Sequence, residues 1–389
     1  MRVAVIGNGQ SVHVVGRSAA LADHGISIRL VTMGPVLPNA RIEVRTRPIP
    51  RHPLAAARAL AGFLRDVRSF QPDLLHLHYA GGRLGSLALL SGIRPLVVNV
   101  MGGDVLPDQH PGGLSPRARR ATRRILERAD AVLVKSEPLL SAVSAFADVG
   151  GKSHVIRWGI DPRDFFPDPE GAAFWRRRLE LRDDALVVFS PRILRPLYNI
   201  DLIVDAFAEA ARSLPQAMLL LAEYGAEAGY RRAIEGQIGR LNLGRQVRFV
   251  GAVPQAEMRG LYSAATAVVM VPSSDGLPQS LFEALACAAP VLLGHLPAYA
   301  EIAEDGRSAL FAEINVPSIG AGLSRLLRDE SLRSTLAREG QVVVREKASL
   351  PRDLERVVQI FEEARAKPRP RPRWDPLGAL LDLVGLAKP

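Results

Sequence analysis

The sequence contains a single cysteine, Cys287, among 389 residues. One thiol cannot form an intramolecular disulfide, and it excludes a zinc site built from cysteines. No run of 18 or more apolar residues is present, so no transmembrane helix is predicted. The opening MRVAVIGNGQ lacks the charged-then-apolar layout and the cleavage site of a signal peptide. We therefore expect a cytoplasmic protein.

Aromatic residues are also scarce, at 5%, and none interrupts the arginine-rich segment SPRARRATRRILER at 115–128. Nucleic acid is therefore not an expected partner. The formal net charge of +10 favours other anionic partners, such as phosphorylated substrates or lipid head groups. Two interpretations of 115–128 stay open: a solvated basic helix face, or contact with an anionic membrane surface or a lipid-diphosphate acceptor.

Short runs of Val, Ile and Leu alternate with segments of helical period, and 48% of the residues are hydrophobic. This alternation predicts α/β domains with parallel sheets covered on both faces. The pattern breaks in the Pro-rich, charged segment 161–184 and then restarts. We predict two doubly wound Rossmann-like domains facing a central cleft. The predicted parts are an N-terminal acceptor-side domain (1–165), a nucleotide-sugar-binding domain (166–350), a helix crossing back to the N-terminal domain (351–366), and a Pro/Arg linker with a short amphipathic tail (367–389).

The most informative stretch is SSDGLPQSLFEALACAAPV at 273–291. We predict that a strand ends near Ser273, that a loop follows, and that an apolar helix comes next. Gly276 permits a positive φ or close approach to a ligand, and the φ of Pro278 suits a first helical turn.

The start of this helix is suited to an anion. Free N–H groups around Gln279, Ser280 and Leu281, together with the positive helix end, fit a diphosphate. Glu283, one turn into the helix, can accept two hydroxyl hydrogen bonds from a ribose, and Asp275 can reach a different group. From these residues alone, a role of the two acids as helix caps is equally consistent.

Several segments together resemble the large retaining glycosyltransferase family four, which has the GT-B fold. The family signature is Glu, seven residues, Glu, then Ala, a short apolar residue, Ala and Pro-Val, and here it reads DGLPQSLFEALACAAPV. Further segments that resemble the family are HLHYAGGRLGSLALL (76–90), NVMGGDVL (99–106), VIRWGIDPRDFFPD (155–168), PRILRPLYNIDLIVDAF (191–207) and VRFVGAVPQAEMRGLYSAATAVVMVPS (247–273).

The resemblance implies roles for residues of the C-terminal half. Glu283 matches the acid that holds the nucleotide ribose, and Asp275 stands where a Glu contacts the hydroxyls of the donor sugar. Arg192 matches the arginine that neutralises the diphosphate. Tyr198 replaces the partner lysine and adds no positive charge, and Arg195 is a candidate to compensate. The loop residues expected to line the donor site are Gly276, Leu277, Pro278, Gln279 and Ser280.

In the N-terminal half, Asp104 is retained and is expected in the catalytic set with Arg192 and Asp275. Met101 stands where many relatives have a histidine. Gly9, with Gly7, matches the glycine turn that faces the cleft.

The resemblance implies transfer of a sugar from a nucleotide-diphosphate sugar to a hydroxyl acceptor, a glycan or lipid-linked saccharide, with retention. The leaving phosphate oxygen takes the acceptor proton, so no dedicated carboxylate base is required. No cofactor is expected. No metal is expected either, because such enzymes lack a metal-binding Asp pair and no spaced His/Asp/Cys cluster stands out in the sequence. Two alternatives remain: a non-catalytic nucleotide-sugar-binding subunit, and a sugar-nucleotide epimerase of the same fold. A dehydrogenase is not expected, because Val12 replaces the third glycine of a G-x-G-x-x-G fingerprint.

Two smaller features complete the expectations. His76 and His78 lie in one predicted strand, and we expect them on opposite faces of the sheet, one packed rather than bound to metal. The tail carries Trp374 and apolar residues at helical spacing. It is predicted either to pack on the N-terminal domain or to anchor the chain at a membrane surface. The apolar positions of the tail are Leu377, Leu380, Leu381 and Val384.

Overall fold

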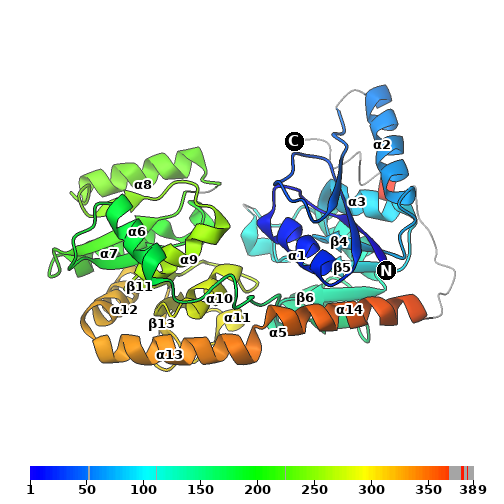
Figure 1. Ribbon diagram of the computed structural model, residues 1–389. Helices are drawn as coiled ribbons and strands as arrows, with labels where there is room; N and C mark the ends of the chain where they lie inside the picture. Colours follow the sequence, from blue (N-terminus) through cyan, green and yellow to red (C-terminus); the bar gives the residue numbers. More distant parts are fainter. Residues whose placement is uncertain (51–52, 111, 224, 368–377, 381–382, 384–389) are drawn as a thin grey trace. The chain divides into compact units, whose positions relative to one another are not determined.

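The computed structural model describes residues 1–389 except 51–52, 111, 224, 368–377, 381–382 and 384–389. The chain forms two compact units, Met1–Trp158 with Arg352–Pro389, and Gly159–Pro351. Each unit is built on one parallel sheet with helices on both faces (Figure 1). The predicted doubly wound α/β class is confirmed.

The first unit contains a seven-stranded sheet in the order β3-β2-β1-β4-β5-β6-β7. The order reverses direction between β1 and β4, and ligands of such sheets bind beyond the carboxyl ends of strands at this point. The strands are β1 (Arg2–Ile6), β2 (Ser27–Thr32), β3 (Glu43–Thr46), β4 (Leu74–His78), β5 (Leu96–Asn99), β6 (Ala131–Val134) and β7 (Ser153–Val155).

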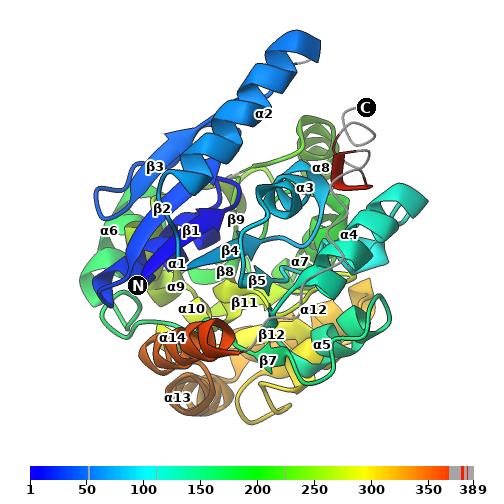
Figure 2. The same ribbon diagram turned by 90° about the vertical axis from the view of Figure 1, so that its right-hand side faces the viewer.

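Helices cover this sheet (Figure 2). One face packs on α2 to α5, because Ala4 and Ile6 share a buried cluster with Phe63, Leu87 and Ile125. The helices of the unit are α1 (Val12–Asp23), α2 (Pro53–Arg68), α3 (Gly82–Ser91), α4 (Pro116–Arg128), α5 (Glu137–Ser144) and α14 (Leu350–Ala366), with the 3-10 turn η1 (Pro107–Gln109).

The opposite face carries both histidines of β4. Their ring centroids are 4.4 Å apart, and His76 also meets Phe361 of α14 edge to face at 5.2 Å. The expectation that His76 and His78 face opposite sides was wrong. Side chains alternate along a strand, so residues two positions apart share a face.

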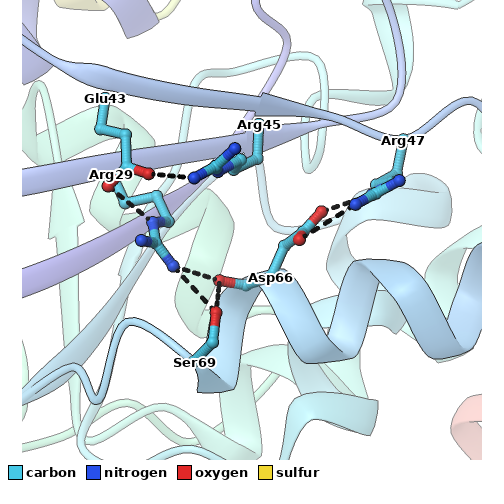
Figure 3. A network of polar contacts seen from close by, with 6 residues as sticks. All are labelled: Arg29, Glu43, Arg45, Arg47, Asp66 and Ser69. Atoms are coloured by element: carbon cyan, nitrogen blue, oxygen red, sulfur yellow. Dashed lines mark hydrogen bonds and ion pairs between the residues drawn. The ribbon is translucent and has the colours of Figure 1, made fainter.

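Charged side chains tie the edge strand β3 to its neighbours (Figure 3). Arg29 of β2 donates to Glu43 at 2.9 Å and to Ser69 at 3.1 Å, and Arg47 pairs with Asp66 of α2 at 2.5 Å. Charges along an exposed edge also discourage pairing with strands of other molecules.

The second unit has a six-stranded parallel sheet in the order β10-β9-β8-β11-β12-β13. One face packs on α7, α8 and α12, and the other on α6, α9, α10 and α11. The strands are β8 (Leu186–Ser190), β9 (Ala217–Leu221), β10 (Val247–Phe249), β11 (Ala267–Met270), β12 (Val291–Gly294) and β13 (Leu310–Ala312). The helices are α6 (Pro169–Arg178), η2 (Pro196–Tyr198), α7 (Ile200–Ala211), α8 (Ala228–Arg240), α9 (Gln255–Ala264), α10 (Gln279–Ala286), α11 (Pro297–Ala300), α12 (Val316–Arg328) and α13 (Glu330–Lys347).

The segments that enter and leave the second unit run side by side. Ile160 donates its N–H to the carbonyl of Ala348 at 2.7 Å and accepts from the N–H of Leu350 at 3.1 Å. A Cβ atom at Gly159 would lie 2.0 Å from the carbonyl carbon of Ala348, so only glycine fits there.

The described part of the tail packs on the first unit. Ala379 and Leu383 are buried within the same core cluster as Ile125, whereas Leu380 is 39% exposed. This burial favours the prediction that the tail docks on the N-terminal domain. The other predicted tail positions, Trp374, Leu377, Leu381 and Val384, lie outside the described residues.

Candidate functional site

The loop between β11 and α10 forms the candidate donor corner, which we define as residues 273–283 together with Arg192 and Tyr198. Helix α10 begins at Gln279, with Pro278 at its N-cap. Sequence reasoning assigned special backbone freedom to Gly276, but a positive φ of 87° is found at the buried Leu277. A bulky residue in this conformation is strained, and such strain is typical of functional loops.

Two of the predicted residues, 83 positions apart in sequence, meet in this corner. Arg192 donates from Nη2 to Oδ2 of Asp275 at 2.7 Å and from Nη1 to Oγ of Ser280 at 3.1 Å. The Arg192 and Asp275 side chains are only 12% and 11% exposed. The guanidinium therefore lies directly beside the first turn of α10.

The environment keeps Arg192 charged. Burial alone would lower its pKa, but the Asp275 carboxylate, supported by nearby tyrosine side chains, raises the pKa above its ordinary value. The ring of Tyr198 stacks on the guanidinium at 4.3 Å. Buried Nε of Arg192 has no hydrogen-bond partner within the described part of the chain.

Polar contacts between two loops hold this geometry. Asn199, which follows Tyr198, donates to the carbonyl of Val271 at 2.8 Å and to Oγ of Ser273 at 3.0 Å. The N–H of Ser273 donates in turn to the carbonyl of Leu197 at 2.9 Å. The loops after β8 and β11 are thus joined close to Arg192.

Glu283 lies deeper along α10 and is 8% exposed. Its Oε2 accepts a hydrogen bond from the hydroxyl of Tyr262 on α9 at 2.8 Å. At the helix start, the N–H of Leu281 donates to the carbonyl of Pro278 at 3.3 Å, and the side-chain amide of Gln279 donates to the carbonyl of Gly159 at 2.8 Å.

Arg195 is placed differently from Arg192, the other predicted cation of the site. It pairs with Glu227 at the N-cap of α8 at 3.2 Å, and both side chains are about half exposed. This partner does not favour the hypothesis that Arg195 replaces the missing lysine.

In the first unit, Asp104 organises the loop after β5. Its carboxylate accepts from the N–H groups of Ala80 at 2.7 Å, Gly102 at 2.8 Å and Met101 at 3.1 Å. Burial raises the pKa of Asp104, and these N–H donors oppose the rise. An acid engaged by three backbone donors is suited to holding a loop rather than to transferring protons.

Met101 lies in a buried polar cluster of the first unit. Its sulfur accepts from Nδ2 of Asn99 at 3.0 Å and from Nη1 of Arg17 at 3.4 Å. Arg17 also stacks on Trp158 at 4.8 Å, and Trp158 donates to Asn99 at 2.7 Å. Burial, opposed by Asp353, lowers the pKa of Arg17 to about 9.

The two histidines of β4 adjoin this cluster. Burial and then Arg17 lower the pKa of His76 to about 3. Burial, His76 and Arg17 hold the pKa of His78 well below its ordinary value. Both rings are therefore neutral at physiological pH.

The glycine turn after β1 is sterically required. A Cβ at Gly9 would lie 2.6 Å from Val36 and 2.9 Å from the carbonyl oxygen of Pro35, and one at Gly7 would lie 2.8 Å from Val14. No larger residue fits without local movement.

Two family models match consecutive parts of the chain. The model described as Glycosyltransferase Family 4 matches residues 7–164, and the model described as Glycosyl transferases group 1 matches residues 172–343. The chain belongs to glycosyltransferase family 4. The predicted activity, glycosyl transfer, is confirmed.

Known proteins agree with this assignment. The family 4 chain is 26% identical to D-inositol 3-phosphate glycosyltransferase 1 of Catenulispora acidiphila, over 94% of this chain and 93% of the relative. It is 28% identical to a GDP-mannose-dependent alpha-(1-6)-phosphatidylinositol monomannoside mannosyltransferase of Mycolicibacterium smegmatis, over 63% and 64%. The structure of Anabaena HepE in complex with UDP-glucose matches with a TM-score of 0.80 at 17% identity, over 93% of this chain and 100% of that chain. The fold is GT-B, as predicted.

Sequence reasoning missed two residues that contact the candidate donor corner from outside it. Tyr262 and Tyr299, both fully buried, donate to Glu283 and Asp275. Both tyrosines lie in apolar helical segments that read as ordinary core, so no sequence signal singled them out.

Two features are absent from the described residues of the glycosyltransferase. None of the helices there is long and apolar enough to cross a membrane. In the same part of the chain, no three His, Cys, Asp or Glu side chains are grouped to hold a metal ion.

Proposed function

We propose that this enzyme binds a nucleoside diphosphate sugar at the donor corner and transfers the sugar, with retention and without metal, to a hydroxyl group of a phosphate-bearing saccharide or lipid-linked acceptor. The observation that supports this most directly is Arg192, a buried cation beside the first turn of α10 with Nε unpartnered among the described residues. A diphosphate supplies the anionic oxygen acceptors that such a group requires.

The roles along the donor follow the order of residues along the corner. Arg192 and the first turn of α10 face the diphosphate, Glu283 accepts hydrogen bonds from the ribose, and Asp275 accepts one from the sugar. As the bond between C1 and the leaving oxygen breaks, its electron pair passes to the diphosphate, and the negative charge there grows. A cation already held in place stabilises that charge without reorganisation.

The acceptor proton moves to the leaving phosphate oxygen in this scheme. The acceptor oxygen forms the new bond to C1 on the face from which the diphosphate departs. Asp275 is paired with Arg192, so it is assigned to binding rather than to proton transfer. Asp104 is likewise assigned to holding its loop.

Relatives suggest the chemistry of both substrates. HepE was solved with UDP-glucose, and the mycobacterial relative is named as GDP-mannose-dependent. The acceptors named for the two relatives, D-inositol 3-phosphate and a phosphatidylinositol monomannoside, both carry phosphate. The net charge of +10 fits an anionic acceptor.

We also propose a cytoplasmic enzyme that attaches peripherally to anionic membrane through α4. Arg117, Arg119, Arg120 and Arg123 are exposed there. Positive charge in the first turn of a helix opposes its dipole, so Arg117 and Arg119 are not explained by the helix dipole. Arg123 lies further along α4 and donates to the carbonyl of Phe146 at 2.7 Å. Basic side chains on a surface helix are suited to anionic head groups.

A thermal-shift screen with UDP-glucose, GDP-mannose, ADP-glucose and dTDP-glucose tests the donor assignment. A ligand at about 100 times its dissociation constant should add about 2.7 kcal/mol to the free energy of unfolding. Transfer to inositol phosphates is then followed by mass spectrometry. Binding without transfer to any acceptor would instead support a non-catalytic subunit, and no stabilisation by any of the four would contradict the proposal.

A further inference from the structure

Each carboxylate of the donor corner is paired with a buried tyrosine from another helix. The hydroxyl of Tyr299 on α11 donates to Oδ2 of Asp275 at 3.1 Å, and that of Tyr262 on α9 donates to Oε2 of Glu283 at 2.8 Å. Both tyrosines are 0% exposed.

Tyr299 and Arg192 share one oxygen of Asp275. Oδ2 accepts from both, whereas Oδ1 accepts no hydrogen bond from the described residues. A guanidinium and a carboxylate readily form two parallel hydrogen bonds that use both oxygens. Here Arg192 makes one contact with Asp275 and directs Nη1 to Ser280, so the second oxygen stays available.

The orientation of the Asp275 carboxylate is fixed only if other residues donate hydrogen bonds to it. The terminal torsion of an aspartate side chain is broad, so its two oxygens exchange places easily. Two donors on Oδ2 hold it in one position. Burial, followed by Asp275, raises the pKa of Tyr299 well above its ordinary value, and burial with Glu283 does the same for Tyr262. Both hydroxyls therefore remain protonated donors.

We propose that Tyr299 is a positioning residue for sugar recognition, which keeps Asp275 in single contact with Arg192 and leaves Oδ1 for a hydroxyl of the donor sugar. Tyr262 holds Glu283 in the same way at the nucleotide end. The inference rests on the proposed function, because it assumes a nucleotide sugar in this corner. The two tyrosines then act on different halves of one ligand.

Tyr299→Phe and Tyr262→Phe are matched variants, since each removes one buried hydroxyl and keeps the ring. Calorimetry gives dissociation constants for UDP and UDP-glucose and for GDP and GDP-mannose. Tyr299→Phe should raise the dissociation constant of the nucleotide sugar about tenfold. The dissociation constant of the nucleoside diphosphate should stay within about twofold of the wild-type value. Tyr262→Phe should weaken both ligands of a pair by similar factors.

The outcomes separate the inference from the function on which it rests. If the wild type binds none of the four ligands, the proposed function fails and the inference fails with it. Suppose that the wild type binds and that Tyr299→Phe leaves both dissociation constants unchanged or changes both by the same factor. Only the inference is then overturned. If Tyr299→Phe does not fold, Asp275→Glu is the second variant, because it keeps the charge opposite Arg192 and displaces the carboxylate oxygens. It should change the dissociation constant of the nucleotide sugar more than that of the nucleoside diphosphate, and an equal change for both ligands would again reject sugar positioning.

Discussion

Arg192 and Asp275 form an ion pair at 2.7 Å in which neither side chain is more than 12% exposed. Removing one partner of a buried pair leaves the other charge without compensation, at a cost of about 3–5 kcal/mol. The pair therefore contributes to folding as well as to the proposed chemistry, and experiments on it must separate the two effects.

Arg192→Ala should lower kcat by about two to three orders of magnitude, because the charge that it stabilises is largest in the transition state. Arg192→Lys is the matched control. Lysine keeps a positive charge but lacks the planar guanidinium whose two terminal nitrogens bind Asp275 and Ser280. We therefore expect a kcat between those of the wild type and Arg192→Ala. Steady-state kinetics on folded protein, verified by circular dichroism, measures both. A raised KM with unchanged kcat would show that Arg192 serves ground-state binding only.

Glu283→Ala should weaken nucleotide binding by about 1.5–3 kcal/mol, the usual worth of hydrogen bonds to a charged group. The measurement is calorimetry with the nucleoside diphosphate selected by the donor screen. Global unfolding of the variant would instead assign Glu283 a structural role with Tyr262, and unchanged affinity would remove it from the ribose site.

Acid should destabilise the first unit through its buried histidines. The pKa of His76 falls from 6.5 to about 3 in the folded protein. Above pH 6.5 the ring is neutral in both the folded and the unfolded state, so it does not lower the free energy of unfolding. Below that pH the unfolded chain binds a proton that the folded chain rejects. Stability then falls by about 1.4 kcal/mol per pH unit, or about 2 kcal/mol by pH 5.

The histidine variant isolates this contribution. His76→Phe should reduce the loss of unfolding free energy between about pH 7.5 and about pH 5 by about 2 kcal/mol, measured by urea denaturation. An identical pH dependence in variant and wild type would contradict the burial of a neutral ring at this position.

Membrane attachment through α4 should depend on position and not only on total charge. The triple variant Arg117→Gln, Arg119→Gln, Arg120→Gln should lose flotation with anionic liposomes. The control Arg232→Gln, Arg240→Gln, Arg245→Gln removes the same charge from exposed positions of the second unit and should float like the wild type. Equal flotation of both variants would reject α4 as the contact.

The tail needs its own variant. Truncation after Ala366 would also remove Ala379 and Leu383 from the core of the first unit. Arg369→Gln, Arg371→Gln, Arg373→Gln tests the basic linker and leaves those two residues in place. Wild-type flotation of this variant would exclude these three arginines from the membrane contact.

The strand, loop and helix around Asp275 were predictable because apolar runs, Gly276 and Pro278 mark their boundaries within one short segment. The alternation of such segments also predicted the parallel sheets of both units. Only the resemblance assigned Arg192 and Asp275 to one site, since no local pattern joins residues 83 positions apart, and the hydrogen bond between them was not predicted.

The remaining features depend on tertiary packing. Tyr262 and Tyr299 look like core residues in sequence, and only their hydroxyl contacts distinguish them. Arg195 is close to Tyr198 along the chain, but its side chain pairs with Glu227. The error on His76 and His78 had another origin, a miscounted strand period, because both lie on one face.

The alkylation rate of Cys287 can report local unfolding at the end of α10. Cys287 caps the carboxyl end of α10, the helix that contains Glu283, and is 3% exposed. Burial, with Glu283 next, raises the pKa of its thiol to about 12, so alkylating reagents meet neither an accessible sulfur nor a thiolate. Modification must await local unfolding of the helix end, and its rate measures how often that end opens. With one cysteine in the chain, the factor by which a bound nucleotide slows alkylation would report how strongly that ligand stabilises α10.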